Sequence, residues 1–229
     1  HTANRRQRQM CIRDRPNSHV IQITHDKSGK VDGVIYVDKS GALQRQAAKV
    51  VCVAGNSIET PRLLLMSKSN MFPNGLANSS DQVGRNYMRH LTASVYATFN
   101  KPVNFYRGET MAGFLADEVK NNPKRGFVGG FYMETLALGP SFMGAFLEPG
   151  GWGKKFANMM DAYQNMAGMW IVGEDMPQST NRITLGTAKD QHGMPAPNVH
   201  FDDHPNDVAM RNYASVSYTH LRAHETQSD

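Results

Sequence analysis

The sequence predicts an α/β fold that is α+β overall and has two parts of different character. In the first part, the apolar run Val50–Val53 leads through small residues into a proline-started helix, as in a strand–helix unit of a parallel sheet. From about residue 91, apolar and polar residues alternate as in antiparallel strands, and helical patterns follow. A hydrophobic content of 40% is typical of a protein with a buried core.

Two strands joined by polar turns precede the apolar run. Val20–Thr24 and Val34–Val37 are rich in β-branched residues, and each is followed by a turn of Asp, Lys, Ser and Gly. They predict a β-meander that leads into a buried strand at Val50–Val53. Cys52 would then be a small hydrophobe inside that strand.

The helix after this strand is expected to begin with Thr60 as its N-cap, Pro61 as its first residue and Leu63–Met66 as its apolar body. The turn before it consists of residues that let a ligand approach the backbone, namely Ala54, Gly55 and Asn56. Open α/β sheets bind phosphate-bearing cofactors at such a corner. The alternative is an ordinary strand–helix unit without a ligand.

The second part is expected to contain five strands, at Thr92–Phe99, Gly126–Tyr132, Met143–Leu147, Met169–Glu174 and Asn181–Leu185. A helix is expected from about Lys154 to Met166, where aromatic and Met side chains recur at helical spacing. Core packing explains the many methionines better than a metal or heme site does.

His200–Asp207 is the most metal-like cluster, with two His and three Asp in eight residues. Its spacing fits no specific zinc or calcium motif. It also fits the start of a helix at Pro205, with Asp207 in the first turn. We therefore predict no metal here.

Composition argues against two classes of partner. The formal net charge is +5, but the basic excess lies mainly in residues 1–15, which carry five Arg against one Asp. The rest lacks a basic stripe with interleaved aromatics, so no nucleic-acid partner is expected. No apolar run of about 18 residues is present, so no membrane span is expected. Two cysteines predict no disulfide framework.

The two ends differ from the body of the chain. Arg5–Arg15 and Ser217–Thr226 look like translated sequencing-adapter sequence, and neither shows sustained periodicity. We therefore interpret residues 1–15 and 215–229 as non-native and residues 16–214 as genuine. A basic arm and a polar tail are the alternative.

Residues 54–67 resemble the second signature of the glucose–methanol–choline (GMC) family of FAD-dependent oxidoreductases. The residues in register are Ala54-Gly55, Ser57, Thr60-Pro61, Leu63-Leu64 and Ser67. Asn56 departs from the signature, and Lys68–Asn70 replaces its Gly-hydrophobic-Gly ending. Together with residues 72–80 and 83–90, the stretch is similar to the branch of gluconate, sorbitol and other sugar dehydrogenase flavoprotein subunits.

The resemblance implies the C-terminal part of a Rossmann-like FAD-binding domain over residues 16–90 and part of a mainly antiparallel substrate-binding domain over residues 91–214. It implies cofactor contacts at the positions that match the family, namely Val20, Ala54, Gly55, Asn56, Thr60, Pro61 and Asn86. Val20 would contact adenine through its backbone. Trp170 and Glu174 are candidate substrate contacts, because aromatic faces and carboxylates suit polyols. A core Trp and a surface Glu are the alternative.

The resemblance further implies oxidation of a sugar, sugar acid or polyol hydroxyl by hydride transfer to the flavin of FAD. A cytochrome or other electron-acceptor subunit is the implied partner, with a periplasmic or membrane-associated location. An alcohol oxidase or lyase of the same family, or a non-catalytic binding module, is the alternative. The chain contains no Gly-x-Gly-x-x-Gly, and the family's catalytic His pair is expected downstream of residue 214. We therefore expect an inactive internal fragment that does not hold FAD tightly.

Overall fold

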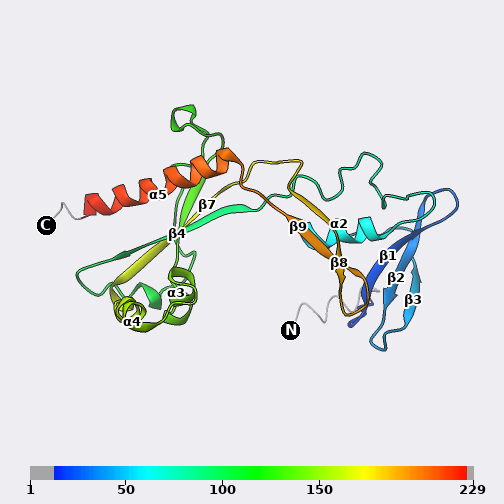
Figure 1. Cartoon of the computed structure of the whole chain (residues 1–229), viewed down its shortest axis with the longest axis horizontal. Coiled ribbons are helices and arrows are strands. Elements are labelled where there is room, and N and C mark those ends of the chain that lie inside the picture. The colour runs from blue at the N-terminus through cyan, green and yellow to red at the C-terminus, as the bar shows by residue number, and fades with distance from the viewer. Residues whose placement is uncertain (1–12, 226–229) are drawn as a thin grey trace. The chain divides into compact units, whose positions relative to one another are not determined.

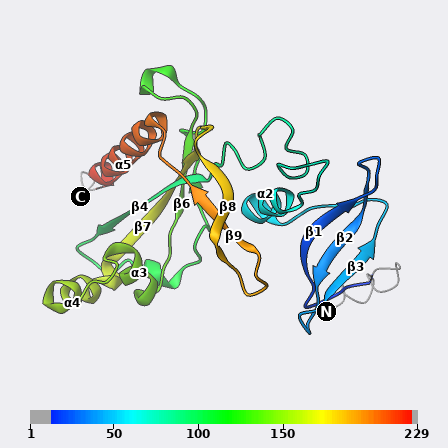
Figure 2. The same ribbon diagram turned by 45° about the vertical axis from the view of Figure 1, so that its right-hand side comes forward.

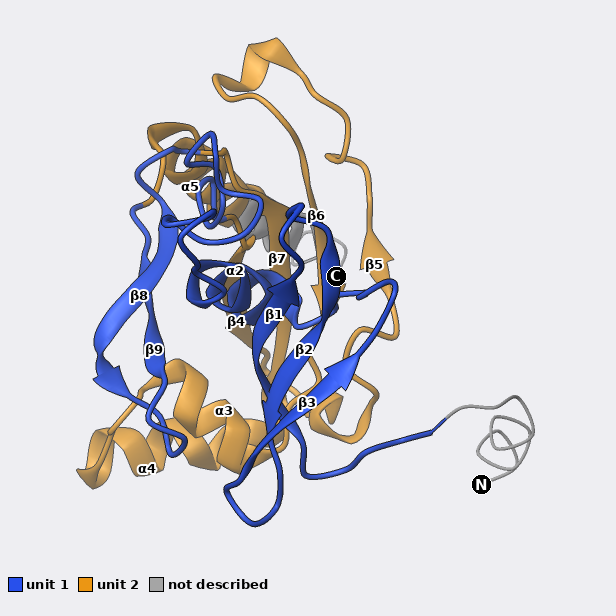
Figure 3. Ribbon diagram, turned by 90° about the vertical axis from the view of Figure 1, so that its right-hand side faces the viewer, with its two compact units in different colours: residues 1–87, 178–202 blue, residues 88–177, 203–229 orange. Residues whose placement is uncertain are grey.

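A computed structural model describes residues 13–225, with side chains up to residue 217. The chain divides into two compact units (Figure 3). Unit 1 contains the chain up to Tyr87 together with Gln178–Asp202, and unit 2 contains Met88–Pro177 together with the chain from Asp203 onward. Every strand pair among the described residues is antiparallel. The α+β class is therefore confirmed, whereas the parallel Rossmann-like sheet is not shown in this part of the chain.

Unit 1 begins with the predicted meander. The strands β1 (His19–His25), β2 (Val31–Val37) and β3 (Leu43–Ala47) pair in that order (Figure 1). Both turns are built by an Asp whose Oδ1 accepts two backbone N–H groups, Asp26 from Ser28 and Lys30, and Asp38 from Ser40 and Ala42. β1 and β2 are thus confirmed. β3 was not predicted, because its side chains are polar and exposed.

The strand predicted at Val50–Val53 is wrong. These residues form no strand, Val50 is 76% exposed, and Cys52 is exposed rather than buried. No strand of the described residues pairs with them, so their backbone groups have no ladder partner and the run crosses unit 1 as an extended segment. An apolar run predicts a strand only where a neighbouring strand is present.

The predicted start of the next helix is also wrong. α2 (Asn56–Met66) begins four residues before Thr60, and Pro61 lies inside it. The Oδ1 atom of Asn56 accepts the N–H groups of Ile58 and Glu59, which satisfies two donors of the first helical turn and allows the helix to start early. At the other end, Ser67 Oγ donates to Leu63 O and accepts the N–H of Ile23 on β1.

A separate two-stranded sheet completes unit 1. It pairs β8 (Arg182–Lys189) with β9 (Pro195–His200), and α2 packs against both strands. We expected the segment from Asn181 to belong to a substrate domain over residues 91–214. In the structure, residues 178–202 instead group with unit 1.

Gly84 joins the loop before unit 2 to β8. Its φ is +83°, its carbonyl accepts the N–H of the buried Ile183 at 2.7 Å, and an added Cβ would overlap the Ile183 carbonyl oxygen. A side chain at position 84 would therefore strain the backbone, because φ is positive, and would also clash with the carbonyl oxygen of Ile183.

We expect Gly84→Ala to lower the free energy of unfolding by about 2 kcal/mol or more, measured by urea denaturation. Gly41→Ala is the matched control, because Gly41 has the same φ of +83° but open space around its Cβ position. It should cost about 1 kcal/mol or less. Equal losses in the two variants would contradict the assigned contact with Ile183.

Unit 2 is built on one antiparallel sheet in the order β4-β7-β6-β5. Its strands are β4 (His90–Thr98), β5 (Phe114–Leu115), β6 (Phe131–Thr135) and β7 (Met166–Glu174). β4 and β7 confirm the strands predicted at Thr92–Phe99 and Met169–Glu174, and β6 lies later than the strand predicted at Gly126–Tyr132.

One face of this sheet packs against α5 (Pro205–Glu225), as Figure 2 shows. The buried side chains between them form the core of unit 2, namely Leu91, Phe127, Phe131, Met133, Ile171, Met210 and Ala214. Several methionines are therefore core residues, as predicted. The helix start at Pro205 is confirmed, and the buried Asp207 in its first turn accepts the N–H of Met176. The helix continues through residues 215–225, which we expected to lack periodic structure.

The opposite face of the sheet carries α3 (Pro140–Leu147), followed by α4 (Gly153–Asp161). The strand predicted at Met143–Leu147 is therefore wrong. Pro140 occupies the first turn of α3, and the adjacent Met143 and Gly144 are both buried, which suits the contact face of a helix. The predicted helix over residues 154–166 is shorter, because a 3-10 turn (Tyr163–Asn165) and then β7 follow α4. The remaining 3-10 turns are Phe105–Arg107 and Pro123–Arg125.

Candidate functional site: an apolar cleft in unit 1

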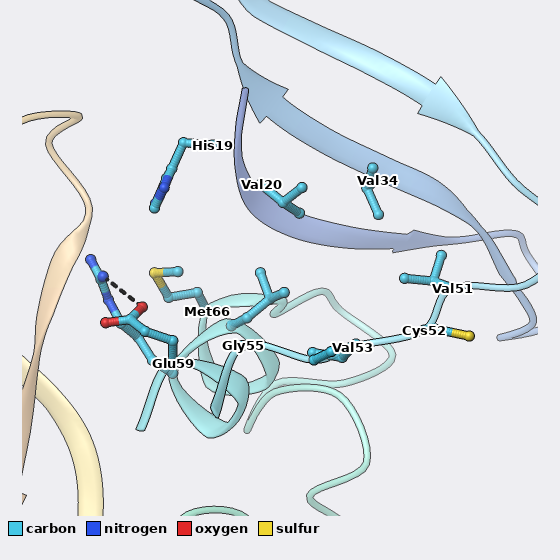
Figure 4. Close-up of a pocket in the computed structure, with 12 residues that line it drawn as sticks. His19, Val20, Val34, Val51, Cys52, Val53, Gly55, Glu59 and Met66 are labelled. Atoms are coloured by element: carbon cyan, nitrogen blue, oxygen red, sulfur yellow. Dashed lines mark hydrogen bonds and ion pairs between the residues drawn. The ribbon is translucent and has the colours of Figure 1, made fainter. Parts of the chain in front are cut away.

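A cleft of about 440 Å³ lies in unit 1 between the meander, the extended segment and α2 (Figure 4). His19 and Val20 of β1 face Glu59 and Met66 of α2 across it. The full lining consists of His19, Val20, Val34, Val51, Cys52, Val53, Ala54, Gly55, Glu59, Arg62, Leu63 and Met66. Most of these side chains are apolar, and its volume lies in the range of small-ligand sites.

Three of the predicted cofactor residues line this cleft, and four do not. Val20, Ala54 and Gly55 contribute to its wall. Asn56, Thr60 and Pro61 instead build the first turns of α2, and Asn86 is an exposed loop residue with a φ of +57°. The structure thus brings together the strand residue and the turn residues, and it leaves Asn86 outside the lining.

The helix terminus in this structure is not arranged as an open anion site. The N–H groups of Ile58 and Glu59 donate to Asn56 Oδ1 at 2.8 and 3.0 Å, and Gly55 N donates to Thr60 Oγ1 at 3.0 Å. Glu59 adds a negative charge in the first turn. A phosphate at this helix end would compete with the chain's own acceptors and face a carboxylate, contrary to our expectation from the sequence.

Arg62 anchors one side of the cleft. It is 4% exposed, and its guanidinium donates to three oxygens: Glu59 Oε2 at 3.0 Å, Asp190 Oδ2 at 2.6 Å and Pro195 O at 2.8 Å. The contacts with Asp190 and Pro195 fix the cleft face of α2 to the β8–β9 loop and to the start of β9. They also engage the cation, so it is not free to bind a phosphate.

The charges around Arg62 are tightly coupled. Burial by itself would raise the pKa of Asp190, but the hydrogen bonds from Arg62 and from the N–H groups of Met194 and His192 outweigh it and lower the pKa from 3.8 to about 2. Asp190 therefore remains ionised at neutral pH.

The α2 side of this cleft was not predicted from the sequence. Arg62 and Leu63 each lie three or four residues from both Glu59 and Met66, so the four share one face of a helix that starts at Asn56. Starting the helix at Thr60 removed Glu59 from it and hid this periodicity. Asn56, a residue that tolerates left-handed backbone and caps helices, was the available signal.

The donor set fits part of a flavin nucleotide. An apolar slot of this size suits adenine, and the Glu59 carboxylate at its edge can accept a hydrogen bond from a ribose hydroxyl. The Arg62 guanidinium and the N–H groups of Gly55, Ile58 and Glu59 are bonded to the chain's own oxygens, so these groups are not free to bind a diphosphate. The cleft therefore fits the adenosine end of FAD, and the remainder of the cofactor has no assigned contact here.

Trp170 and Glu174 lie on β7 but have different neighbours. Trp170 is half-buried and meets Phe146 of α3 edge-to-face, with ring centroids 6.2 Å apart. Glu174 is exposed at the end of the strand, with its carboxylate beside Gly129. Trp152, the other Trp, is 87% exposed.

Residues 13–225 show neither a metal-binding cluster nor a helix that could span a membrane. His200 Nε2 lies 3.0 Å from Asp202 Oδ2, but no described group of three His, Cys, Asp or Glu side chains is arranged to hold an ion. Within the same residues, no helix is both long enough and apolar enough to cross a membrane.

Comparison with individual known proteins, rather than with family models, identifies the family. No family model matches the chain. The 2-methyl-1,2-propanediol dehydrogenase of Mycolicibacterium austroafricanum is 39% identical over 215 residues, which cover 87% of this chain and 38% of that protein. The fructose dehydrogenase large subunit of Gluconobacter japonicus is 29% identical over 202 residues, 82% of this chain and 35% of that subunit. The chain belongs to the GMC family of flavin oxidoreductases.

A third GMC relative is the 6'''-hydroxyparomomycin C oxidase of Streptomyces lividus, 27% identical over 212 residues that cover 87% of this chain and 35% of that protein. The chain spans little more than a third of the length of the curated relatives it matches. The family predicted from residues 54–67 is thereby confirmed. The relatives are named both as dehydrogenases and as oxidases.

Proposed function

We propose that this chain is a segment of an FAD-dependent GMC dehydrogenase that oxidises a hydroxyl of a sugar, sugar acid or polyol. The observation that carries the proposal is the apolar cleft beside Ala54 and Gly55, in a chain that is 39% identical to a diol dehydrogenase. The cleft brings Val20 of β1 next to the turn that matches the family signature. Such a cleft is suited to adenine, which needs an apolar slot and few polar contacts.

In this proposal the chain's residues bind and orient the adenosine end of the cofactor. The β1 backbone at Val20 contacts the adenine edge, Val53 and Met66 contribute the apolar walls, and Glu59 accepts a hydrogen bond from the ribose. Arg62 holds Glu59 and α2 in place through Asp190. When FAD is bound, its flavin accepts the hydride from the alcohol carbon. The base that takes the hydroxyl proton is expected outside this chain.

The substrate and the electron acceptor are proposed by analogy with the relatives. One relative is named for a small diol and another for a sugar, so a polyhydroxylated alcohol is the common chemistry. The sugar-acting relative is a large subunit, which supports a separate electron-acceptor subunit, such as a cytochrome, as the partner. A periplasmic or membrane-associated location through that partner is part of the same proposal.

Binding of AMP to the 229-residue chain tests the adenosine site directly. In 1H–15N NMR spectra, AMP is expected to shift the amide signals of Val20, Val53, Gly55 and Glu59, with saturation in the millimolar range. Val20→Trp should weaken this response about 10-fold or more, because the indole fills the slot, whereas Val20→Ala should leave it nearly unchanged because the proposed contact is made by the backbone.

Leu43→Trp is the matched control, since it adds the same side chain on the exposed strand β3 outside the cleft lining. Shifts confined to residues outside the cleft, or an unchanged response in Val20→Trp, would reject the adenosine site. Flavin content and dye reduction with fructose, gluconate and sorbitol, compared with oxygen consumption, test the activity in the longer protein. Rapid oxygen consumption without dye reduction would favour the oxidase alternative.

A further inference from the structure

The face of the unit 2 sheet opposite α5 carries an ordered row of side chains. Glu134 on β6 lies directly opposite Trp170 on β7, and Ser94 on β4 lies opposite Trp170 on its other side. Directly opposite residues in antiparallel strands share a face, with Cβ atoms about 5 Å apart. An indole is therefore flanked by a carboxylate on one side and a hydroxyl on the other.

Aromatic residues border this row. Phe146 of α3 stands perpendicular to Trp170 at an interplanar angle of 87°, so the two rings form a corner on this face. Tyr132 lies two residues before Glu134 on β6, and the neighbouring Glu134 carboxylate raises the pKa of Tyr132. Phe114 of β5 contacts the Tyr132 ring edge-on at 6.5 Å.

This row differs in composition from the α5 face of the same sheet. That face is almost wholly apolar and is filled by α5, whereas the row combines aromatic rings with a carboxylate and hydroxyls that are only partly buried. Aromatic rings pack against the C–H groups of a sugar ring, and a carboxylate accepts strong hydrogen bonds from its hydroxyls.

We propose that the Trp170–Phe146 corner and Glu134 bind the ring form of a sugar, with Ser94 and Tyr132 as further hydrogen-bonding groups. The inference rests on the proposed function and specifies its substrate class: a cyclic sugar rather than a small diol. A ring can lie against the aromatic corner and reach the carboxylate of Glu134 at the same time, because Glu134 is directly opposite Trp170 on the neighbouring strand. A four-carbon diol has no ring face to offer the indole.

The proposal assigns the carboxylate role to Glu134 rather than Glu174. Glu174 is four residues beyond Trp170 on the same strand, a separation of about 13 Å along β7. It is in register with His90 at the sheet end, and its carboxylate lies beside Gly129. A monosaccharide that rests on Trp170 and bonds Glu134 would not reach it.

Intrinsic fluorescence tests the proposal, because Trp152 and Trp170 are the two tryptophans of the chain. In a Trp152→Phe background, Trp170 is the single reporter, and methyl β-D-glucoside locks the probe as a ring. Its titration to about 100 mM is expected to give a saturable change in emission. Sorbitol should bind about 10-fold more weakly, and 2-methyl-1,2-propanediol should give no saturable change.

Two carboxylate variants in the same background form a matched pair. Glu134→Gln should weaken glucoside binding about 10-fold or more, through loss of charge-assisted hydrogen bonds, whereas Glu174→Gln should leave it unchanged. Circular dichroism confirms that each variant is folded. Absence of a saturable response in folded Trp152→Phe protein, or equal affinities in the two Gln variants, would overturn the proposal.

The result is separable from that of the AMP experiment, because the Trp170 response requires no flavin. AMP binding without a sugar response would reject the sugar site alone. A sugar response without AMP binding would reject the adenosine site and leave the sugar site standing.

Discussion

Arg62→Met is expected to lower the free energy of unfolding of unit 1 by about 3 kcal/mol. The methionine keeps most of the side-chain volume, so the loss reports the guanidinium contacts rather than a cavity. Those contacts join α2 to Asp190 and to the Pro195 carbonyl, more than 120 residues away in sequence. Without the cation, the partly buried Pro195 carbonyl and the partly buried Asp190 carboxylate lose their donor. Urea denaturation combined with hydrogen exchange of the α2 and β8 amides measures the effect on this unit.

The pH dependence distinguishes this contact from simple packing. The pKa of Asp190 is lowered to about 2 in the folded protein, so its contribution to stability is complete above about pH 4 and is lost as the pH falls toward 2. This contribution is about 2 kcal/mol. The difference in stability between wild type and Arg62→Met should therefore narrow as the pH falls from 4 to 2.

Two variants control for the geometry of the contact. Arg62→Lys keeps the charge but cannot bond three oxygens at once, so its stability should be intermediate. Glu59→Gln changes the more exposed partner and should cost less than 1 kcal/mol. A difference between wild type and Arg62→Met that stays constant from pH 7 to pH 2 would show that the Asp190 bond does not contribute as described.

Asn181→Ala is expected to have the second large effect, a loss of about 2 to 3 kcal/mol. Asn181 is 1% exposed, and its amide both donates to Asp202 O at 2.9 Å and accepts from Asp202 N at 2.8 Å. Its backbone carbonyl accepts the N–H of Tyr87 at 2.9 Å. One residue thus ties together three segments of unit 1 that are distant in sequence.

Hydrogen exchange identifies the source of the loss. In Asn181→Ala the amide of Asp202 loses its acceptor and should exchange faster than in wild type. Gln178→Ala is the matched control, because Gln178 also donates to Asp202 O but is only half-buried and makes this bond at an exposed position, so its removal should cost less than 1 kcal/mol. Unchanged protection of the Asp202 amide in Asn181→Ala would refute the assigned role.

Local patterns predicted much of the fold. β1, β2, β4, β7 and the start of α5 were predictable because each carries its own signal: alternating or β-branched residues for the strands, and Pro205 with Asp207 for the helix. The two Asp-built turns were likewise predictable from their residues. Short-range preferences suffice where side chains bond within a few residues of their own backbone.

The predictions failed where the outcome depends on distant neighbours. Val50–Val53 has the composition of a buried strand but lacks a paired neighbour among the described residues. Met143–Leu147 is a short, mostly apolar run of the kind that also forms strands. It is helical here because Pro140 starts a helix and Met143 and Gly144 pack in its contact face. A short apolar run is compatible with both states, so tertiary contacts decide between them.

The candidate sites show the same division. The sequence indicated the corner at Ala54–Gly55 through its small residues, and the family resemblance drew attention to Trp170 as an aromatic residue suited to polyols. It did not indicate Arg62 as the anchor of α2, or Glu134 as the neighbour of Trp170. The first needs the β8–β9 loop beside α2, and the second needs the register between β6 and β7.

The sequence by itself determined the family, the antiparallel strands of unit 2 and the position of the small-residue corner, because each of these depends on a pattern of neighbouring residues in the sequence. Only the tertiary structure decided which charges meet at Arg62, which carboxylate flanks Trp170, and that residues 178–202 group with unit 1. The physical reason is that these hydrogen bonds, ion pairs and strand registers join segments that are far apart in sequence. No pattern within either segment alone indicates its partner.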